Sequence, residues 1–471
     1  MHRAPFFTPT PAWVGDTIPF VHEDVLHVYY LHHQREAPGQ GTSWHLVTTT
    51  DLVTWEDHGE VLPHGTAAEE DLNCYTGSIV TDEDGLHHLF STAQNPAFTA
   101  PDGRPLQRVA HATSTDLLHW TKHPEHTFSA PEGYDPADFR DPFVHRPDPH
   151  GPWEMLLAAR HAAGPERRRG TVGRLTSTDL HTWEPAPPLW DPQRFLTQEC
   201  PEVFRIGQWW YLVYSEFTDA FVTRYRMSRS PEGPWHAPRY DSLDGRSFYA
   251  AKSAQWRGRR IFAGWIATRE GRRDDGPWQW AGTLSLLEAV PREDGTLDLR
   301  LPPEVLAQDT TTADPGLEPV ILEAATGYAS AVGRAELPSR ATIRADLDLD
   351  PDGRAGGLLL RTDAEGEHGY VLRLEPQAGR MVLDRWPRTI TGTEQWQISG
   401  DVPHLLELER PADLSAPHHR LDLVLEDDLL VAVLDERVAL STRLYDHPTG
   451  RLGVFAEDAS LTLTALHVTT A

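Results

Sequence analysis

The stretch Thr50-Asp51-Leu52-Val53-Thr54-Trp55 recurs as Thr115-Asp116-Leu117-Leu118-His119-Trp120 and again as Thr178-Asp179-Leu180-His181-Thr182-Trp183. The three tryptophans are spaced by 65 and 63 residues, and Ser230–Trp235 is a weaker fourth copy. Short β-type runs such as Trp209–Tyr214 lie between the copies and are separated by turn signals. A fixed period of short strands with a recurring tryptophan is typical of propeller blades. Roughly 300 residues at this period predict about five blades, with each copy acting as a turn followed by a core anchor.

The residue pattern of the chain changes near Leu301. Residues 308–318 are rich in Thr, Asp and Pro, which suits a linker. Later segments such as 341–347 and 420–425 alternate apolar and polar residues, which predicts an antiparallel β-sandwich. We therefore expect an all-β chain with a five-bladed β-propeller at 1–305, a linker at 306–318 and a β-sandwich at 319–471.

The bulk composition excludes several classes of partner. A formal charge of −28 over 471 residues repels nucleic acid and anionic membranes, and it suits a neutral or cationic ligand. Two cysteines, Cys74 and Cys200, do not make a disulfide framework, so we expect free thiols in a reducing compartment. The first residues lack a signal-peptide pattern, and no run of about 18 apolar residues occurs. These features favour a cytoplasmic protein.

Three short acidic stretches carry the chemical information: Trp13–Asp16, Phe139–Pro142 and Gln198–Pro201. A pair of carboxylates with a third acid in support is the usual equipment for cleaving a glycosidic bond. One acid stays ionised and attacks the anomeric carbon, and the other is held protonated to release the leaving oxygen. Taken singly, each stretch also fits a structural turn or a salt bridge.

Each acid has a neighbour suited to tuning it. Gly15 allows close backbone approach to Asp16, and Trp13 offers a wall on which a sugar can stack. Arg140 and Asp141 face one pocket only where the backbone is irregular, because adjacent side chains on a regular strand point apart. Glu199 beside the weakly polar thiol of Cys200 predicts a low-dielectric pocket that raises its pKa.

Histidine is abundant, with 25 residues, including His32 and His33. The sequence contains no His-x-x-x-His on a helix and no Cys-x-x-Cys, so we expect neither zinc nor any other metal, and no organic cofactor.

Taken in order, the acidic stretches resemble those of glycoside hydrolase family 32, the β-fructofuranosidases, which include invertases, inulinases and levanases. That family carries a Trp-x-Asn-Asp-Pro-Asn-Gly nucleophile motif, an Arg-Asp-Pro motif and a Glu-Cys motif. Further similar segments are Trp44–Trp55, Cys74–Ser78, Asp244–Ala251, Gly264–Ile266, Trp280–Ser285 and Val431–Tyr445. The resemblance covers nearly the whole chain.

The resemblance implies the roles of individual residues. Asp16 would be the nucleophile, Glu199 the acid/base and Asp141 the stabiliser of the transition state. The residues that would bind substrate are Trp13, His32, Trp44, Tyr75, Thr76, Arg140, Tyr249 and Trp280. The mechanism would retain anomeric configuration, with the two catalytic carboxyls about 5–5.5 Å apart in the central funnel.

The chain departs from the family pattern around the nucleophile. Gly15 and Thr17–Pro19 replace the two asparagines, and Leu31-His32 follows Tyr29-Tyr30 where the family has glutamine. Ser247 stands in place of an acid and Leu287-Glu288 in place of Pro-Arg. Each lost hydrogen bond to the sugar removes about 1 kcal/mol or more. This pattern indicates an altered glycone or linkage preference, with His32 or His33 as a replacement donor.

We therefore expect a retaining exo-glycosidase that hydrolyses terminal β-fructofuranosyl, or similar furanosyl, linkages in short oligosaccharides. The alternatives are an inverting arabinofuranosidase or xylosidase of family 43, in which the carboxyls are roughly 6.5–9.5 Å apart, a fructosyltransferase, and a non-catalytic carbohydrate-binding protein. A homodimer is left open.

Overall fold

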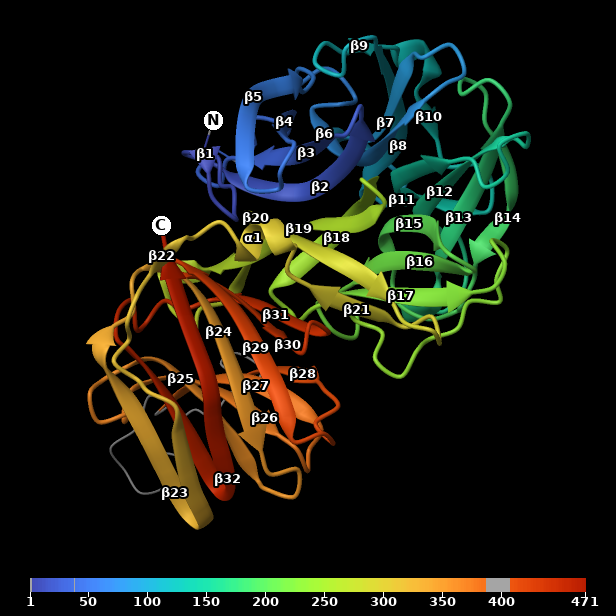
Figure 1. Cartoon of the computed structure of the whole chain (residues 1–471). Coiled ribbons are helices and arrows are strands. Elements are labelled where there is room, and N and C mark those ends of the chain that lie inside the picture. Colours follow the sequence, from blue (N-terminus) through green and yellow to red (C-terminus); the bar gives the residue numbers. More distant parts are fainter. Residues whose placement is uncertain (1, 38, 387–406) are drawn as a thin grey trace, which may run out of the picture. The chain divides into compact units, whose positions relative to one another are not determined.

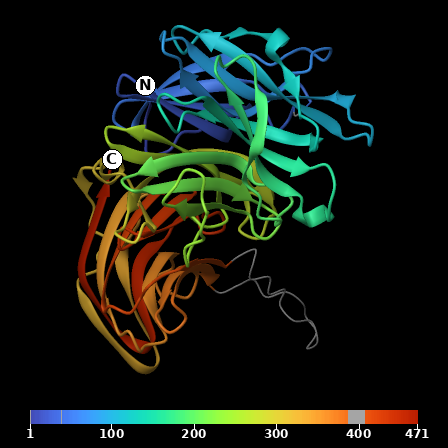
Figure 2. The same cartoon turned by 90° about the vertical axis from the view of Figure 1, so that its right-hand side faces the viewer.

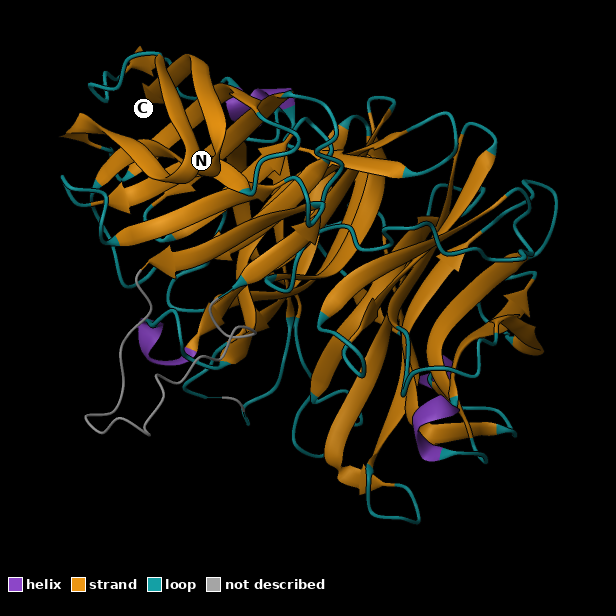
Figure 3. Cartoon of the chain, turned by 90° about the horizontal axis from the view of Figure 1, so that it is seen from below, coloured by secondary structure: helices purple, strands orange, loops and turns teal. Residues whose placement is uncertain are grey.

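The computed structural model describes residues 2–37, 39–386 and 407–471, and the chain folds into two compact units. The first comprises Met1–Leu243, Phe248–Ile266 and Ala281–Leu297, and the second comprises Asp244–Ser247, Ala267–Trp280 and Asp298–Ala471. Strands dominate both units (Figure 3). None of the helices in the described ranges combines the length and hydrophobicity needed to span a bilayer. The predicted boundaries at 305 and 319 stay a prediction.

The first unit is built from five propeller blades, coloured blue to yellow in Figure 1. Blade 1 consists of β1 (His2–Arg3), β2 (Trp13–His22), β3 (Val25–His33), β4 (Trp44–Thr49) and β5 (Thr54–Leu62). Blade 2 consists of β6 (Asn73–Thr81), β7 (His87–Thr99), β8 (Pro105–Ser114), β9 (Thr121–Lys122) and β10 (Phe128–Ser129), with η1 at Pro124–His126. Blade 3 consists of β11 (Tyr134–His145), β12 (Trp153–His161), β13 (Gly170–Ser177) and β14 (Glu184–Trp190), with η2 at Glu166–Arg168.

Blade 4 consists of β15 (Glu199–Ile206), β16 (Trp209–Glu216) and β17 (Val222–Ser228). Blade 5 consists of β18 (Phe248–Trp256), β19 (Arg259–Arg269), β20 (Trp278–Pro291) and β21 (Leu297–Arg300), with η3 at Glu270–Arg272. Residues 267–280 and 298–300 of these elements count with the second unit. The innermost strands β2, β6, β11, β15 and β18 contact one another in that order, and β18 returns to β2. The prediction of five blades is confirmed.

The first and last blades are joined by short pairings. Val14 of β2 pairs with Gly282 of β20, which makes blades 1 and 5 one continuous hydrogen-bonded sheet. Phe7 exchanges two backbone hydrogen bonds with Leu284 of β20. The segment before β2 therefore contributes to the closure of the ring.

The repeated motif forms the turn before the outer strand of blades 1, 2 and 3. In the first copy the hydroxyl of Thr49 accepts the N–H of Leu52, and the carboxylate of Asp51 accepts the N–H groups of Val53 and Thr54. Ser114 and Asp116, and then Ser177 and Asp179, repeat this arrangement. The leucine of each copy has a φ of 63–65° and is buried. The repeat is thus a side-chain-capped turn with a core anchor, as its sequence predicts.

These anchors pack each blade against the preceding one. Leu117 and Trp120 of blade 2 join a core cluster with Ile18 and Tyr29 of blade 1, and the Tyr29 hydroxyl donates to the Leu117 carbonyl. In the same way Leu180 and Trp183 of blade 3 pack with Phe90 of blade 2. The propeller core therefore consists of apolar layers between adjacent blades.

The second unit is a β-sandwich, coloured orange to red in Figures 1 and 2. Its strands are β22 (Thr311–Thr312), β23 (Val320–Glu336), β24 (Arg340–Leu349), β25 (Ala355–Thr362), β26 (Gly369–Glu375), β27 (Arg380–Trp386), β28 (Leu408–Pro411), β29 (His418–Glu426), β30 (Leu429–Leu434), β31 (Val438–Arg443) and β32 (Arg451–Thr470), preceded by α1 (Pro303–Leu306). The long β32 pairs with β25 through its first half and with β24 through its second half, so it belongs to both layers. Leucine-rich inner faces of both layers form one core.

Candidate active site

One irregularity recurs in all five innermost strands. In each, the innermost strand has one residue more than its partner between two successive pairs, which is a β-bulge. The unpaired residues are Gly15 and Asp16 in β2, Thr76 in β6, Asp141 and Pro142 in β11, Cys200 and Pro201 in β15, and Ala250 and Ala251 in β18. Asp141, Cys200 and Ala250 have φ values of 49–58°. The irregular backbone predicted for Arg140 and Asp141 is therefore present, and the same device serves the other acids.

Asp16 lies among side chains from three other blades. The Thr76 hydroxyl donates to its Oδ2 at 2.6 Å, and the Trp265 indole N–H donates to its Oδ1 at 3.1 Å. The Cys200 thiol lies 3.8 Å from Oδ2. Burial raises the pKa of Asp16 to about 7. The hydrogen bond from Thr76 lowers this pKa, and the negative charges of Asp141 and Glu199 raise it further.

Asp141 is the most buried of the three acids, with its side chain 5% exposed. Its Oδ2 accepts the backbone N–H of Cys200 at 3.0 Å and lies 3.8 Å from Nε of Arg140. Its own N–H donates to the Thr92 hydroxyl. Burial raises the pKa of Asp141, and the positive charge of Arg140 opposes the rise.

Glu199 is held between a cation and a phenol. Arg140 donates to Oε1 at 3.0 Å, and the Tyr249 hydroxyl donates to Oε2 at 2.7 Å. The Tyr249 ring stacks on Phe221 with centroids 3.8 Å apart, which fixes its hydroxyl. The side chain of Glu199 is 23% exposed, so solvent reaches this acid more readily than Asp141.

The predicted surroundings of Glu199 are wrong in one respect. The Cys200 thiol lies 3.8 Å from Oδ2 of Asp16, whereas the hydrogen-bond donors to Glu199 are Arg140 and Tyr249. The side chains that contact Glu199 are therefore polar, and the thiol contacts Asp16. Burial raises the pKa of the Cys200 thiol well above its usual range, so it stays protonated beside Asp16.

The contacts form a continuous chain through all five blades. It runs from Thr76 to Asp16, then through Cys200 to Asp141, and through Arg140 to Glu199 and Tyr249. Three carboxyls that are far apart in the sequence are thereby brought together with one guanidinium. This arrangement can supply a carboxylate nucleophile, a proton donor and a hydroxyl acceptor to a single ligand.

The model of the glycosyl hydrolases family 32 N-terminal domain matches residues 6–302. The chain belongs to glycoside hydrolase family 32. It is therefore a β-fructofuranosidase-like glycoside hydrolase of a family that acts on fructosyl linkages. This membership confirms the resemblance to family 32. It is preferred over the two alternatives of a family 43 enzyme and a non-catalytic carbohydrate-binding protein.

Named relatives of this family 32 chain agree with that assignment. The raffinose invertase of Escherichia coli is 27% identical over 80% of this chain and 78% of its own length. The levanbiose-producing levanase of Bacillus subtilis is 27% identical over 54% of this chain and 47% of its own length. The structure of fructan 1-exohydrolase IIa from Cichorium intybus superposes with a TM-score of 0.77 at 17% identity, covering 100% of this chain and 98% of that one. This likeness supports the propeller and sandwich fold.

The other predicted binding residues of the family 32 chain fall into two groups. Thr76, Arg140 and Tyr249 contact the acids directly. Tyr75 lies next to Thr76 and is half-buried, and its pKa is raised by burial and then by the charge of Asp16. Trp13 is also half-buried, with the guanidinium of Arg35 at 4.9 Å from its ring centroid.

Trp44 and His32 are not brought to the acids, and the place of Trp280 stays a prediction. Trp44 is fully buried and its indole N–H donates to backbone carbonyls, so its prediction as a binding residue is corrected to a core role. His32 stacks on His45 at 3.9 Å and lines a pocket of about 330 Å³ that contains none of the three acids. Trp280 belongs to the second unit and is 36% exposed, so its role stays a prediction.

Sequence reasoning missed several supports of the site. The Trp265 indole N–H bonds Asp16, although only the motif around it was recognised. Buried Lys252 donates to the Gly77 carbonyl at 2.6 Å and counters the rise in the pKa of Asp141. Ile18, at the second family asparagine position, is buried in a core cluster, so it does not replace the lost sugar contact.

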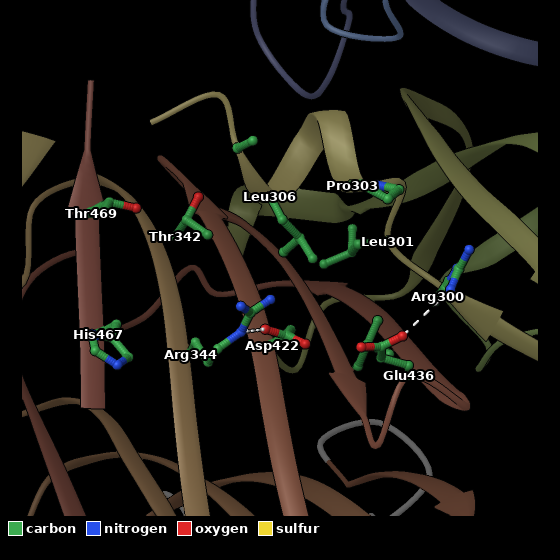
Figure 4. Close-up of a pocket in the computed structure, with 12 residues that line it drawn as sticks. Arg300, Leu301, Pro303, Leu306, Thr342, Arg344, Asp422, Glu436, His467 and Thr469 are labelled. Atoms are coloured by element: carbon green, nitrogen blue, oxygen red, sulfur yellow. Dashed lines mark hydrogen bonds and ion pairs between the residues drawn. The ribbon is translucent and has the colours of Figure 1, made fainter. Parts of the chain in front are cut away.

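The sandwich also contains a pocket, of about 420 Å³ (Figure 4). Its charged groups satisfy each other, since Arg344 pairs with Asp422 and Arg300 pairs with Glu436. The described residues that line it include no Trp, Tyr or Phe on which a sugar could stack. The acid cluster of the propeller is therefore the better candidate site.

Proposed function

We propose that the protein is a retaining exo-glycosidase that hydrolyses terminal β-fructofuranosyl linkages in short oligosaccharides. The observation that carries the proposal is the chain of contacts that joins Asp16, Asp141 and Glu199 with Arg140 and Tyr249. In the first step the Asp16 carboxylate attacks the anomeric carbon while Glu199 gives its proton to the leaving glycosidic oxygen. The glycosidic bond breaks as the bond to Asp16 forms.

In the second step Glu199 takes a proton from water, and the hydroxide attacks the anomeric carbon and releases Asp16. Asp141 accepts hydrogen bonds from sugar hydroxyls, because its buried carboxylate has no cation closer than Arg140 at 3.8 Å among the described residues. Arg140 and Tyr249 hold Glu199 at the position from which it serves both steps. When water occupies the site next to the covalent intermediate, the intermediate is hydrolysed. When a second sugar is bound there, the fructosyl group is transferred to that sugar, which is the transferase alternative.

The anomer of a trapped product tests the mechanism. Free fructose loses its configuration in water, so wild-type protein is incubated with sucrose, inulobiose and levanbiose in the presence of methanol, and the methyl fructoside is analysed by NMR. Methyl β-fructofuranoside formed with retention supports the proposal. Inverted product, or equal product from the Asp16→Asn protein, contradicts it.

A rescue experiment tests the role of Glu199 separately. Glu199→Ala should lose activity on sucrose. On a fructoside whose leaving group departs without protonation, azide should restore turnover as a fructosyl azide of retained configuration, because azide needs no general base. Internal cleavage of long fructans in preference to terminal release would contradict the exo assignment. The cytoplasmic location and a homodimer stay predictions, which cell fractionation and light scattering can test.

A further inference from the structure

A cluster of five histidines lies where blade 2 meets blade 3. His88 is on β7, His111 is on β8, and His123 and His126 flank or belong to η1, all in blade 2. His181 belongs to the repeat turn between β13 and β14 of blade 3. Its ring centroid lies 4.7 Å from that of His126 and 5.4 Å from that of His111. Ring nitrogens of His111, His126 and His181 all lie within 4.8 Å of one another.

A hydrogen-bond relay fixes which nitrogen of His111 faces the cluster. Nε2 of His88 lies 3.2 Å from the carboxylate of Asp82, which can only accept, so this nitrogen donates. In the neutral ring the other nitrogen, Nδ1, then accepts. Nε2 of His111, 3.0 Å away, must then donate. This leaves Nδ1 of His111 unprotonated and directed at Nδ1 of His126.

The relay matches the surroundings of a metal-binding histidine. Ligating histidines use one nitrogen for the ion and donate the other N–H to a partner that sets the tautomer. Nδ1 of His111 lies 3.2 Å from Nδ1 of His126, whereas two ligands on a tetrahedral zinc ion with bonds of about 2.0–2.1 Å are about 3.3–3.4 Å apart.

We propose that His111, His126 and His181 bind one divalent transition-metal ion, of the Zn²⁺ class, as a structural clamp between blades 2 and 3. Imidazole nitrogen is a preferred ligand of zinc, and three such ligands leave one position for water. His181 is exposed on its turn, so rotation of its side chain can close the remaining separation. The formal charge of −28 favours the approach of a cation.

His123, Glu125 and His126 form a second, overlapping group with ligand atoms within 4.8 Å. We favour the first group because it contains the buried His111, whose Nδ1 lies 3.2 Å from Nδ1 of His126. The first group also joins two blades, whereas the second lies on one short turn. The two sets share His126 and are separated by changing His181 or His123 alone.

Calorimetric titration with ZnCl₂ tests the site. The full-length protein, freed of any affinity tag and stripped with EDTA, is compared with His181→Ala, His123→Ala and Asp82→Asn. His150→Ala is the matched control, because His150 is exposed on the β11–β12 loop outside the cluster. We expect one equivalent of Zn²⁺ in the wild-type and His150→Ala proteins. Asp82→Asn removes the carboxylate that sets the tautomer of His88 and, through it, of His111, so it should weaken binding by about tenfold. His181→Ala removes a proposed ligand and should weaken binding at least as much.

A second readout separates binding at this cluster from scattered surface binding. Zn²⁺ should raise the thermal unfolding midpoint of the wild-type protein and leave that of His181→Ala unchanged, with near-ultraviolet circular dichroism confirming that both proteins are folded. Three outcomes would overturn the proposal. They are no stoichiometric binding, equal affinity in the His181→Ala and wild-type proteins, and loss of binding in His123→Ala but not in His181→Ala.

Discussion

Replacing Asp16 with asparagine should stabilise the protein above neutral pH while it removes the proposed nucleophile. Burial raises the pKa of Asp16 from an ordinary 3.8 to about 7. Each unit corresponds to about 1.4 kcal/mol, so an ionised Asp16 costs the folded state about 4 kcal/mol above pH 7. Asparagine has no charge to bury. Its carbonyl oxygen can still accept from Trp265, and its amide can donate to the Thr76 hydroxyl.

The sign of the effect follows from proton linkage. Between pH 3.8 and about 7 the folded state keeps a proton on Asp16 that the unfolded state releases, so this group lowers wild-type stability as pH rises through that range. The difference between Asp16→Asn and wild type should therefore grow by about 2 kcal/mol from pH 5 to pH 7 and level off by about pH 8. After about 1 kcal/mol for a weakened hydrogen bond, a net gain of roughly 3 kcal/mol remains at pH 8.

Urea unfolding of both proteins at pH 5, 6, 7 and 8 measures this difference. Asp51→Asn is a control of opposite sign, because hydrogen bonds from Val53 and Thr54 outweigh burial and lower the pKa of Asp51. That variant should be less stable than wild type at pH 8, since the stability from Asp51 is present above its unfolded pKa. A pH-independent difference for Asp16→Asn, or a loss of stability at pH 8, would refute the assignment of Asp16 as a strained carboxylate.

Three further changes probe the same contacts. Tyr249→Phe removes the donor to Oε2 of Glu199 and should lower kcat/KM by about tenfold, with a KM unchanged within twofold if the phenol does not bind substrate. Arg140→Lys cannot reproduce the guanidinium fork that holds Glu199 and should lower kcat/KM by roughly 30- to 150-fold, whereas full activity would show that only the charge matters. Cys200→Ser places a stronger donor beside Asp16, so the acidic limb of the kcat/KM profile should move to lower pH; an unmoved limb would deny the contact. The buried, protonated Cys200 should also resist iodoacetamide at pH 7, measured by mass spectrometry with the unfolded protein as the positive control.

Much of the fold could be predicted because the repeat is a local device. Asp51, Asp116 and Asp179 cap the turns through backbone groups two and three residues away, so the pattern is visible in a short window. The leucines and tryptophans of these turns pack into the apolar core between adjacent blades. Sequence alone did not show the direction in which they pack, because the contact of Trp120 with Tyr29 joins residues from different blades.

The acids could be found from their motifs, but their partners could not. A bulge adds one residue and reverses the alternation of side chains, so the thiol of Cys200 meets Asp16 rather than its neighbour Glu199. Trp44 was predicted to bind substrate from a motif that cannot distinguish a pocket wall from the core. The histidine cluster escaped the spacing rules for zinc because its members come from β8, η1 and a turn of the next blade.

The bulges also mean that insertions and deletions act differently from substitutions in this propeller. Removing one residue from the pair Asp141-Pro142 would leave β11 with as many residues as β12 between Arg140 and Phe143, so the hydrogen-bonded ladder would become regular. The sheet would gain order, yet every side chain on one side of the deletion would change face. A single deletion could thus yield a better-formed blade with no catalytic centre, and genetic drift toward regular strands is a route by which such an enzyme can lose its chemistry without losing its fold.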